Sequence, residues 1–497
     1  MGIFMKKVKS LCMLSTALTI ALSTNLMPIP AYAQANSVST AAMSHSSVHQ
    51  TAASPYLQSA NWDADAKNNI NDFLRQYGKQ SPNYDKKNKP YATLDFDNTT
   101  SIMDVEEQLM IWQLDHLAFA IKPDKLAEIL QSGISPDKLN LTYGANDGSG
   151  TQVTLQAAID DAVKDYAELY SKGLVTKNGS EIPADVKTSF AYQDFRAKMR
   201  WLYDAVSETM DTSVSYPWVT YWFTGMTPKE IFDLAYTCDS YYGDSQKGQT
   251  WTVGKYTTPD GEERAAGKVD VSFKQGITVT PEVKELYRSL AANGIDPWIV
   301  SASQVDVVKA AVKYFEIPNV VNVVGMTNKL AKDGTYINEY DYDLHAQTQG
   351  VGKSLSIEKV IRPLYHGQGP IFCAMDSQGD FNFCTEFKDT KAVLIMNRQR
   401  KDDAALCAAI AAFEQKKSIS LLAANKNNDV KYILQGRNET VGQLWPEQDT
   451  QFLGKTSKSF LSERALNAIN DLDNGMSIAQ MLAKNTKLKD YQGYKTR

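Results

Sequence analysis

The chain has 497 residues, of which 43% are hydrophobic, enough for a large core and for two or three folding units. Its 52 lysines and arginines are outnumbered by 57 aspartates and glutamates, which gives a formal net charge of −5. An acidic chain of this kind argues against nucleic acid as the main partner.

The first thirty-three residues have the order of a cleavable secretory signal. Lys6, Lys7 and Lys9 are followed by the apolar stretch LCMLSTALTIALSTNLM and then by AYA, which ends at Ala33. A membrane anchor is the alternative, but serines and threonines interrupt the apolar stretch. We therefore expect cleavage after Ala33 and a secreted or periplasmic protein. No later stretch reaches the roughly eighteen consecutive apolar residues of a membrane span, so we expect no stable membrane insertion.

Residues 34–58 are rich in serine, alanine and threonine, which predicts a flexible leader. A metal-binding tail is the alternative, but His45 and His49 have no partners nearby in the sequence. Four cysteines follow the expected signal: Cys238, Cys373, Cys384 and Cys407. Four in so long a chain do not form a disulfide-dependent scaffold, and their pairing is left open.

Five short apolar runs predict strands that are covered on both faces. They lie at residues 91–96, 297–303, 319–326, 370–376 and 391–397. Continuous rather than alternating apolar runs are typical of a parallel sheet. Three helical patterns separate them: one ends at Gly294, one follows Ser303 and one ends at Gly367. This alternation predicts a doubly wound α/β sheet. One hairpin is also expected, with Asp333 and Gly334 at its turn.

Residues 105–290 interrupt this rhythm, because they are long, largely helical and rich in aromatic residues. We expect a helical cap domain here, with a second independent domain as the alternative. A cap is favoured because ligands bind at the carboxyl ends of parallel strands, where this segment leaves the sheet. The catalytic core would then comprise residues 59–104 and 291–400. Residues 401–497 would form a C-terminal extension that packs on the core.

Chemistry is indicated first by the stretch ATLDFDNTTS, in which Asp95 and Asp97 follow an apolar run. A lone pair of aspartates is weak evidence, since turns favour Asp and Asn for structural reasons. Four more residues stand at later strand ends or at the start of a helix: Ser301, Lys353, Asp376 and Asp380. Because parallel strands end at one edge of the sheet, we expect all six side chains to converge there.

In this order the motifs resemble those of the haloacid dehalogenase (HAD) superfamily of phosphotransferases. The resemblance spans residues 95–380, with a gap of cap size after the first motif. It implies a Rossmann-like core with an inserted cap and phosphoryl transfer to a carboxylate. An acid at Asp97 indicates a phosphatase, since the dehalogenase and phosphonatase members lack one there.

The resemblance also implies a role for each residue. Asp95 would attack phosphorus and form an aspartyl-phosphate, and Asp97 would serve as general acid and then as general base. The Thr99 and Ser301 hydroxyls would bind phosphoryl oxygens, while Lys353 would stabilise the developing charge.

A carboxylate can approach an anionic phosphate ester only if charge is neutralised, which requires a hard cation with oxygen ligands, most simply Mg²⁺. The expected ligands are a carboxylate oxygen of Asp95, the backbone carbonyl of Asp97, and Asp376. Asp380 would orient Lys353 or a metal-bound water. Other divalent ions suit the same oxygens.

Two stretches resemble the secreted phosphorylcholine phosphatases of this superfamily. One is DVEEQL, with Glu106 and Glu107, and the other is YPWVTYWFTG, with Tyr216, Trp218 and Trp222. A quaternary ammonium donates no hydrogen bonds, so proteins hold it with aromatic faces and carboxylates. These five side chains are therefore choline candidates. Alternatively, the aromatics are cap core and the glutamates are first-turn acids favoured by the helix dipole.

The leading hypothesis is an exported, Mg²⁺-dependent phosphomonoesterase that hydrolyses phosphocholine or a similar small phosphate ester. A broad-specificity or phosphoserine-type phosphatase is the alternative within enzymes. An alternative of another class is a catalytically silent choline-binding or surface interaction protein that kept the fold. The oligomeric state is left open.

Overall fold

The computed structural model describes residues 54–243 and 251–497. The expected signal, and the leader as far as residue 53, lie outside the described residues. From Ser54 the chain is packed, because Leu57 is buried and its amide donates to Asn71 Oδ1 at 2.8 Å. The expected leader therefore does not include Leu57. The first helix of the described residues is α1 (Ala64–Tyr77).

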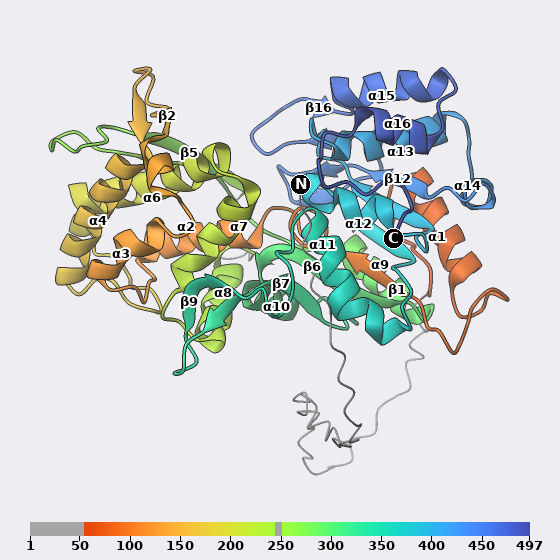
Figure 1. Cartoon of the computed structure of the whole chain (residues 1–497), viewed down its shortest axis with the longest axis horizontal. Helices are drawn as coiled ribbons and strands as arrows, with labels where there is room; N and C mark the ends of the chain where they lie inside the picture. The colour runs from red at the N-terminus through yellow and green to blue at the C-terminus, as the bar shows by residue number, and fades with distance from the viewer. Residues whose placement is uncertain (1–53, 244–250) are drawn as a thin grey trace, which may run out of the picture. The chain divides into compact units, whose positions relative to one another are not determined.

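The centre of the fold is a six-stranded sheet (Figure 1). Its strands are β1 (Tyr91–Leu94), β6 (Asp296–Gln304), β7 (Val323–Met326), β10 (Phe372–Met375), β11 (Ala392–Met396) and β12 (Lys431–Gln435). They are all parallel, in the order β12-β11-β10-β1-β6-β7. The expected parallel α/β sheet is confirmed, with β1 at its interior.

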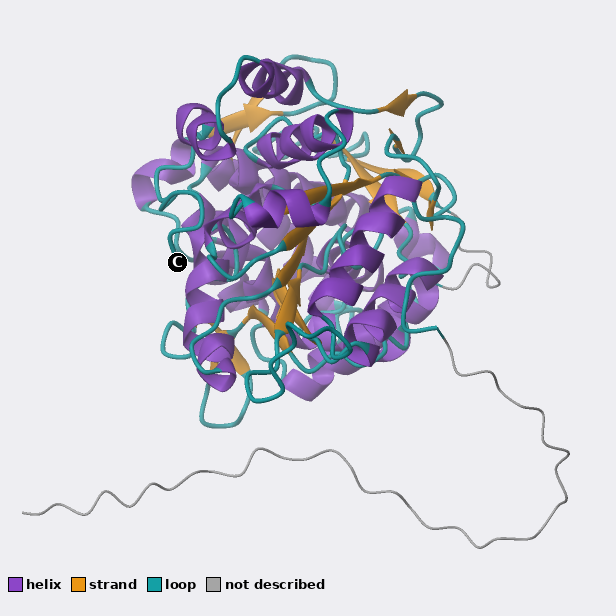
Figure 2. Cartoon of the chain, turned by 90° about the vertical axis from the view of Figure 1, so that its right-hand side faces the viewer, coloured by secondary structure: helices purple, strands orange, loops and turns teal. Residues whose placement is uncertain are grey.

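Successive side chains of each strand enter two different cores, as the pleat requires. Leu94 and Ala374 lie in one core, which α1, α9 (Pro281–Ala292) and α10 (Val305–Tyr314) complete. Cys373 and Met375 lie in the other core, together with residues of α12 (Phe381–Glu386) and α13 (Ala404–Lys416). Figure 2 shows helices on both sides of the strands. The apolar runs were continuous because both faces are covered.

The segment inserted between β1 and α9 is mainly helical. Its elements are α2 (Val105–His116), α3 (Pro123–Leu130), η1 (Pro136–Asn140), β2 (Thr142–Gly144), β3 (Gln152–Thr154), α4 (Leu155–Ser171), α5 (Ala184–Lys187), α6 (Phe190–Thr209), α7 (Thr212–Thr220), η2 (Tyr221–Phe223), α8 (Pro228–Tyr242), β4 (Thr252–Thr257) and β5 (Asp270–Gln275). The expected boundary at residue 290 falls inside α9, which packs on β6. The described residues from Ser54 onward belong to one compact unit, so a separate cap domain stays a prediction.

Helix starts in this segment follow ordinary capping chemistry. Asp104 caps α2, and its side chain accepts the amides of Glu106 and Glu107. Thr227 and Glu230 form a capping box at the start of α8. Such caps satisfy amides that have no partner inside the helix. The cap at Asp104 fixes where α2 begins, only a few residues beyond the Asp95 loop.

The chain between β7 and β12 connects the later strands. Apart from β10 and β11 and the two helices named above, it contains β8 (Asn328–Leu330), β9 (Tyr336–Tyr340), α11 (Val351–Ser356), the π-helical turn η4 (Ile357–Ile361), η5 (Arg362–Tyr365), η6 (Gln378–Asp380) and α14 (Leu421–Lys426). Strands β8 and β9 are antiparallel, which confirms the expected hairpin.

The C-terminal region does more than pack on the core, because β12 is a strand of the main sheet. It continues into a small sheet and two helices: β13 (Arg437–Asn438), β14 (Gln443–Leu444), β15 (Thr450–Gln451), β16 (Lys458–Ser459), α15 (Glu463–Asp473) and α16 (Ile478–Asn485). The expected core boundary at residue 400 therefore excludes an edge strand of the core itself.

Within the described residues, no helix combines the length and apolarity needed to cross a membrane. Cys238, Cys373, Cys384 and Cys407 are buried free thiols.

Candidate active site

Asp95 follows β1 directly, and the loop after it is held by hydrogen bonds. The Asp95 amide donates to the carbonyl oxygen of Ala374 at 3.2 Å, and its own carbonyl accepts from Thr100 Oγ1 at 2.7 Å. The amides of Thr100 and Ser101 both donate to the carbonyl of Phe96, each at 2.9 Å. The Asp95 carboxylate is thereby fixed at the carboxyl end of a central strand.

The side chain of Lys353, on α11, joins two of the expected aspartates. Its Nζ donates to Asp95 Oδ1 and to Asp380 Oδ1, each at 2.6 Å, and Lys353 is buried. Burial opposes the ammonium charge, but Asp380 and Asp95 outweigh it and raise the pKa of Lys353. Two roles were expected for Asp380: to orient Lys353 or to orient a metal-bound water. In the structure Asp380 accepts a hydrogen bond from Lys353, as the first role requires.

Asp97 is held by three donors. Its Oδ2 accepts from Ser301 Oγ at 3.0 Å and from Ser303 Oγ at 2.7 Å, and its Oδ1 accepts from the Val105 amide at 2.8 Å. Burial raises the pKa of Asp97, while the hydrogen bonds from Ser303, Val105 and Ser301 work in the opposite direction. A carboxyl group with a raised pKa is suited to carry a proton at near-neutral pH.

The two hydroxyls expected to bind phosphoryl oxygens are engaged with aspartates. Thr99 Oγ1 donates to Asp95 Oδ2 at 2.8 Å, and Ser301 Oγ donates to Asp97 as described above. Neither residue lines the cavity, whereas Ser303 does. Phosphate binding by Thr99 and Ser301 therefore stays a prediction that requires their hydroxyls to change partner.

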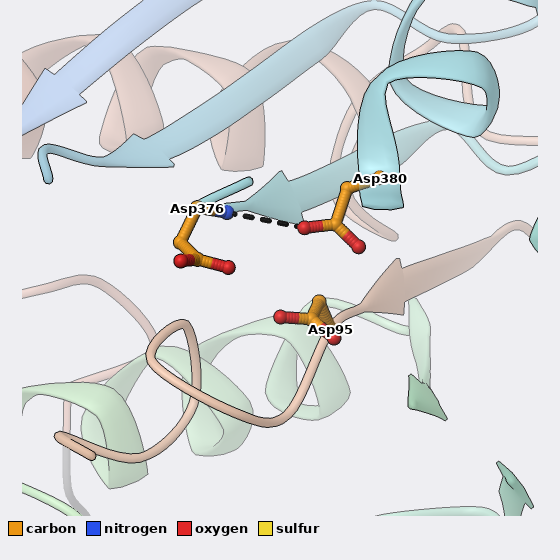
Figure 3. A group of neighbouring side chains, drawn as sticks. All are labelled: Asp95, Asp376 and Asp380. Atoms are coloured by element: carbon orange, nitrogen blue, oxygen red, sulfur yellow. Dashed lines mark hydrogen bonds between the residues drawn. The ribbon is translucent and has the colours of Figure 1, made fainter. Parts of the chain in front are cut away.

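Three buried aspartates could hold a metal ion. Carboxylate oxygens of Asp95, Asp376 and Asp380 all lie within 4.8 Å of one another (Figure 3). Asp380 is already committed, because Oδ1 accepts from Lys353 and Oδ2 accepts from the Asp376 and Ser377 amides. The expected ligands are engaged as well, because Asp95 accepts from Lys353 and Thr99 and Asp376 accepts from Arg398. Metal binding by Asp95 and Asp376 therefore stays a prediction. A donor set of buried oxygens fits Mg²⁺, and the backbone carbonyl of Asp97 stays a prediction.

An arginine outside the sequence motifs stands beside Asp376. Arg398, just after β11, donates from Nη1 to Asp376 Oδ2 at 2.7 Å. Its guanidinium supplies positive charge at the carboxylate expected to bind metal. Applied to β11, the strand-end rule would have found Arg398, since residues 391–397 were an expected strand.

A cavity of about 240 Å³ opens over these groups. The core contributes Asp95, Asp97, Lys353, Asp376 and Asp380 to its lining, together with Arg398 and Arg400. The inserted segment contributes Asp104 and Glu106 at the start of α2, Tyr203 and Ser207 on α6, and Ser215, Tyr216 and Val219 on α7. The cavity thus has acidic and aromatic groups on the side of the inserted segment and basic groups after β11.

Glu106 is the most unusual group on that acidic side. It is 6% exposed, its Oε2 accepts the Gln304 amide at 2.8 Å, and its Oε1 has no hydrogen-bond partner among the described residues. Burial raises the pKa of Glu106 to about 8, against the hydrogen bond from Gln304. Glu106 lines the cavity, and a buried oxygen without a partner beside a cavity is suited to bind a ligand group.

The five choline candidates separate into two groups. Glu106 and Tyr216 line the cavity. Trp218 and Trp222 do not, because both are 1% exposed and pack edge to face at 5.5 Å in the core of the inserted segment. Glu107 does not either, since its Oε1 accepts from Arg200 Nη2 at 2.8 Å. The structure therefore does not bring Trp218, Trp222 and Glu107 to the cavity, and a choline-binding role for them stays a prediction.

No family model matches the chain, and no curated protein is significantly similar to it. The chain is similar to a solved structure, that of a conserved functionally unknown protein from Anaerococcus prevotii DSM 20548. The TM-score is 0.68 and the identity 26%, over 81% of this chain and 100% of that one. The arrangement of elements is thus shared with a solved protein whose description assigns no activity.

Two other likenesses score lower. A phosphoserine phosphohydrolase-like protein from Francisella tularensis subsp. tularensis SCHU S4 has a TM-score of 0.26 and 14% identity, over 62% of this chain and 87% of that one. Cytosolic 5'-nucleotidase IIIB bound to cytidine has a TM-score of 0.28 and 13% identity, over 67% and 78%. Scores this low carry no argument about this chain.

The ion pairs of Lys353 make a prediction about stability. Lys353→Met would leave Asp95 and Asp380 buried without their cation, and breaking a buried pair from one side costs about 3–5 kcal/mol. Uncompensated burial raises both carboxyl pKa values above the roughly 3.9 of an unfolded aspartate, so the loss should shrink as the pH falls. Urea unfolding with EDTA at pH 7 and pH 5 measures this. A loss below about 1 kcal/mol at pH 7 would contradict the pairing.

Proposed function

We propose that the protein is a phosphomonoesterase of the HAD type that acts through an aspartyl-phosphate. The observation that carries the proposal is the buried group at the ends of β1 and β10, where Lys353 Nζ lies 2.6 Å from both Asp95 and Asp380, with Asp376 close by. A binding protein has no need of a nucleophile, an acid and a cation in one cavity, which argues against the silent alternative.

The proposed chemistry uses two aspartates in turn. A carboxylate oxygen of Asp95 bonds to phosphorus as the bond to the leaving alkoxide breaks, and Asp97 gives its proton to that alkoxide. Asp97 then takes a proton from water, which attacks the aspartyl-phosphate and regenerates Asp95. The raised pKa of Asp97 and its three fixed hydrogen bonds suit the first of these tasks.

The charge of the phosphoryl group requires positive groups around it. Lys353 supplies one, held in place by Asp380. Asp95 and Asp376 would hold Mg²⁺, which supplies charge that offsets the phosphoryl oxygens when bound. Ser303 lines the cavity and could donate to a phosphoryl oxygen in place of its bond to Asp97.

For the leaving group we propose a small alcohol that carries an ammonium group, with choline as the first candidate. Glu106 and Asp104 offer carboxylates to the cavity, and Tyr203 and Tyr216 offer aromatic side chains. This combination is what a quaternary ammonium needs.

Phosphoserine is the second candidate, because Arg398 and Arg400 line the same cavity and would pair with a carboxylate that phosphocholine lacks. Export of the protein is also a proposal, supported only by the sequence of residues 1–33.

Phosphate release from phosphocholine, phosphoserine and p-nitrophenyl phosphate, with Mg²⁺ and with EDTA, tests the proposal. We expect turnover with Mg²⁺, loss of more than about 100-fold with EDTA, and the highest kcat/KM for phosphocholine. Equal kcat/KM for all three esters would contradict the ammonium site, and a preference for phosphoserine would favour the second candidate. Absence of turnover with every ester would contradict the phosphatase itself.

Glu106 allows a sharper test of the ammonium site. At pH 9, where Glu106 is charged, Glu106→Gln should raise KM for phosphocholine about tenfold and change KM for p-nitrophenyl phosphate less than about twofold. In the unsubstituted protein, the ratio of kcat/KM for phosphocholine to that for p-nitrophenyl phosphate should rise as the pH passes through about 8, because Glu106 then becomes charged.

Glu107→Gln is the matched control for this test. It removes the neighbouring carboxylate, which pairs with Arg200 outside the cavity lining, so the ratio and its pH dependence should not change. Equal effects of the two substitutions, or a flat ratio across pH 7–9, would remove the assignment of Glu106.

A further inference from the structure

Arg437, a buried arginine of the C-terminal region, contacts the loop that carries Asp95. Arg437, the first residue of β13, is 1% exposed. Its Nη1 donates to the carbonyl oxygen of Asn98 at 2.6 Å, and its Nη2 donates to Asn98 Oδ1 at 2.8 Å. Asn98 directly follows Asp97 and has a φ of 63°, in the left-handed region. One guanidinium thus holds the main chain and the side chain of a residue in an uncommon conformation.

Arg437 is itself held by Glu439. This glutamate is 0% exposed, and its Oε1 accepts from Arg437 Nη2 at 2.7 Å. Its Oε2 accepts from Lys274 Nζ at 3.0 Å and from the Leu453 amide at 3.2 Å. Burial raises the pKa of Glu439, but Arg437, Lys274 and Arg398 outweigh it and hold the pKa at about 2. Glu439 is therefore a permanent anion surrounded by cations.

The same carboxylate reaches the second side of the site. Glu439 Oε1 lies 4.0 Å from Arg398 Nε, and Arg398 Nη1 donates to Asp376 Oδ2. Lys274 belongs to β5 of the inserted segment. Glu439 thus stands between the Asp95 loop, the arginine on Asp376 and the inserted segment, although it is far from each of them in sequence.

The backbone that carries the pair has little freedom. Gly436 separates β12 from β13, and its amide donates to the carbonyl oxygen of Glu447 at 2.9 Å. A Cβ at this position would lie 2.0 Å from the carbonyl oxygen of Asp449. The close approach of the two backbones fixes where Arg437 leaves the main sheet.

We propose that Arg437 and Glu439 are positioning residues, which hold the Asp95–Asp97 loop and Asp376 in the geometry that phosphoryl transfer needs. The C-terminal region would then be part of the catalytic machinery as well as of the fold. The proposal rests on the proposed function for its kinetic effects, but the order of the loop can be measured without any substrate.

The kinetic test compares Arg437→Met with a buried ion pair that is remote from the cavity. Arg437→Met should lower kcat for p-nitrophenyl phosphate about 100-fold, since small displacements of reacting groups have effects of this size, and change KM less than about threefold. The Mg²⁺ concentration for half-maximal rate should rise. The control is Lys431→Met, because Lys431 pairs with Glu414 at 3.5 Å, is 0% exposed and does not line the cavity.

Both substitutions remove a buried cation and should lower the melting temperature, but Lys431→Met should keep kcat within about twofold. Arg437→Lys retains the charge but lacks the planar donors. Relative to Arg437→Met, it should restore the melting temperature more fully than it restores kcat. A kcat that falls equally in Arg437→Met and Lys431→Met, or that does not fall in Arg437→Met, would overturn the proposal.

Hydrogen exchange provides the readout that does not depend on catalysis. Amides of residues 95–103 should exchange faster in Arg437→Met and Arg437→Lys than in the unsubstituted protein. In Lys431→Met their exchange rates should not change. If the protein turns over no phosphate ester, faster exchange in the Arg437 variants still supports the positioning role while the proposed function fails. Unchanged exchange in both Arg437 variants would overturn the positioning role whatever the enzyme assay gives.

Discussion

The site depends on one ammonium group held between two carboxylates. Four aspartates are gathered where parallel strands end, and buried carboxylates without partners cost several kcal/mol each. Lys353 offsets part of this cost by contacting Asp95 and Asp380 at 2.6 Å, and Arg398 does the same for Asp376. Negative charge still exceeds positive charge there, which is the condition under which a divalent cation binds. The aspartates proposed as nucleophile, acid and metal ligands can share one small volume only because of this balance.

The same constraint explains why the site draws on the whole chain. The sheet supplies the aspartates, the inserted segment supplies the side of the cavity with Glu106 and Tyr216, and the C-terminal region supplies Arg437 and Glu439. An anion such as Glu439, with a pKa of about 2, offsets the mutual repulsion of the three basic side chains Arg437, Lys274 and Arg398. The C-terminal region therefore contacts the site through charged side chains, and it contributes β12 to the main sheet.

The strand-end aspartates could be found from the sequence because their positions follow from local rules, whereas Lys353, at the start of a helix, was indicated by the resemblance to a known motif order. Buried strands are continuous apolar runs, and ligands collect at their carboxyl ends. The errors concern partners that are distant in sequence. Glu107 pairs with Arg200, 93 residues away, and Arg437 reaches Asn98 across 339 residues. Trp218 resembles a ligand-binding aromatic by its neighbours, but its indole donates to the carbonyl of Leu130 inside the core. No periodicity encodes such contacts.

The most direct test of the account is whether phosphate becomes attached to Asp95. The protein would be mixed with p-nitrophenyl phosphate and Mg²⁺, quenched in acid within the first turnovers, and treated with borohydride, which reduces an acyl phosphate to the alcohol. Mass spectrometry of the peptide that contains residues 91–101 should show homoserine in place of Asp95, and Asp95→Asn should show neither this product nor turnover. Turnover without any change at Asp95, or normal turnover by Asp95→Asn, would contradict the account.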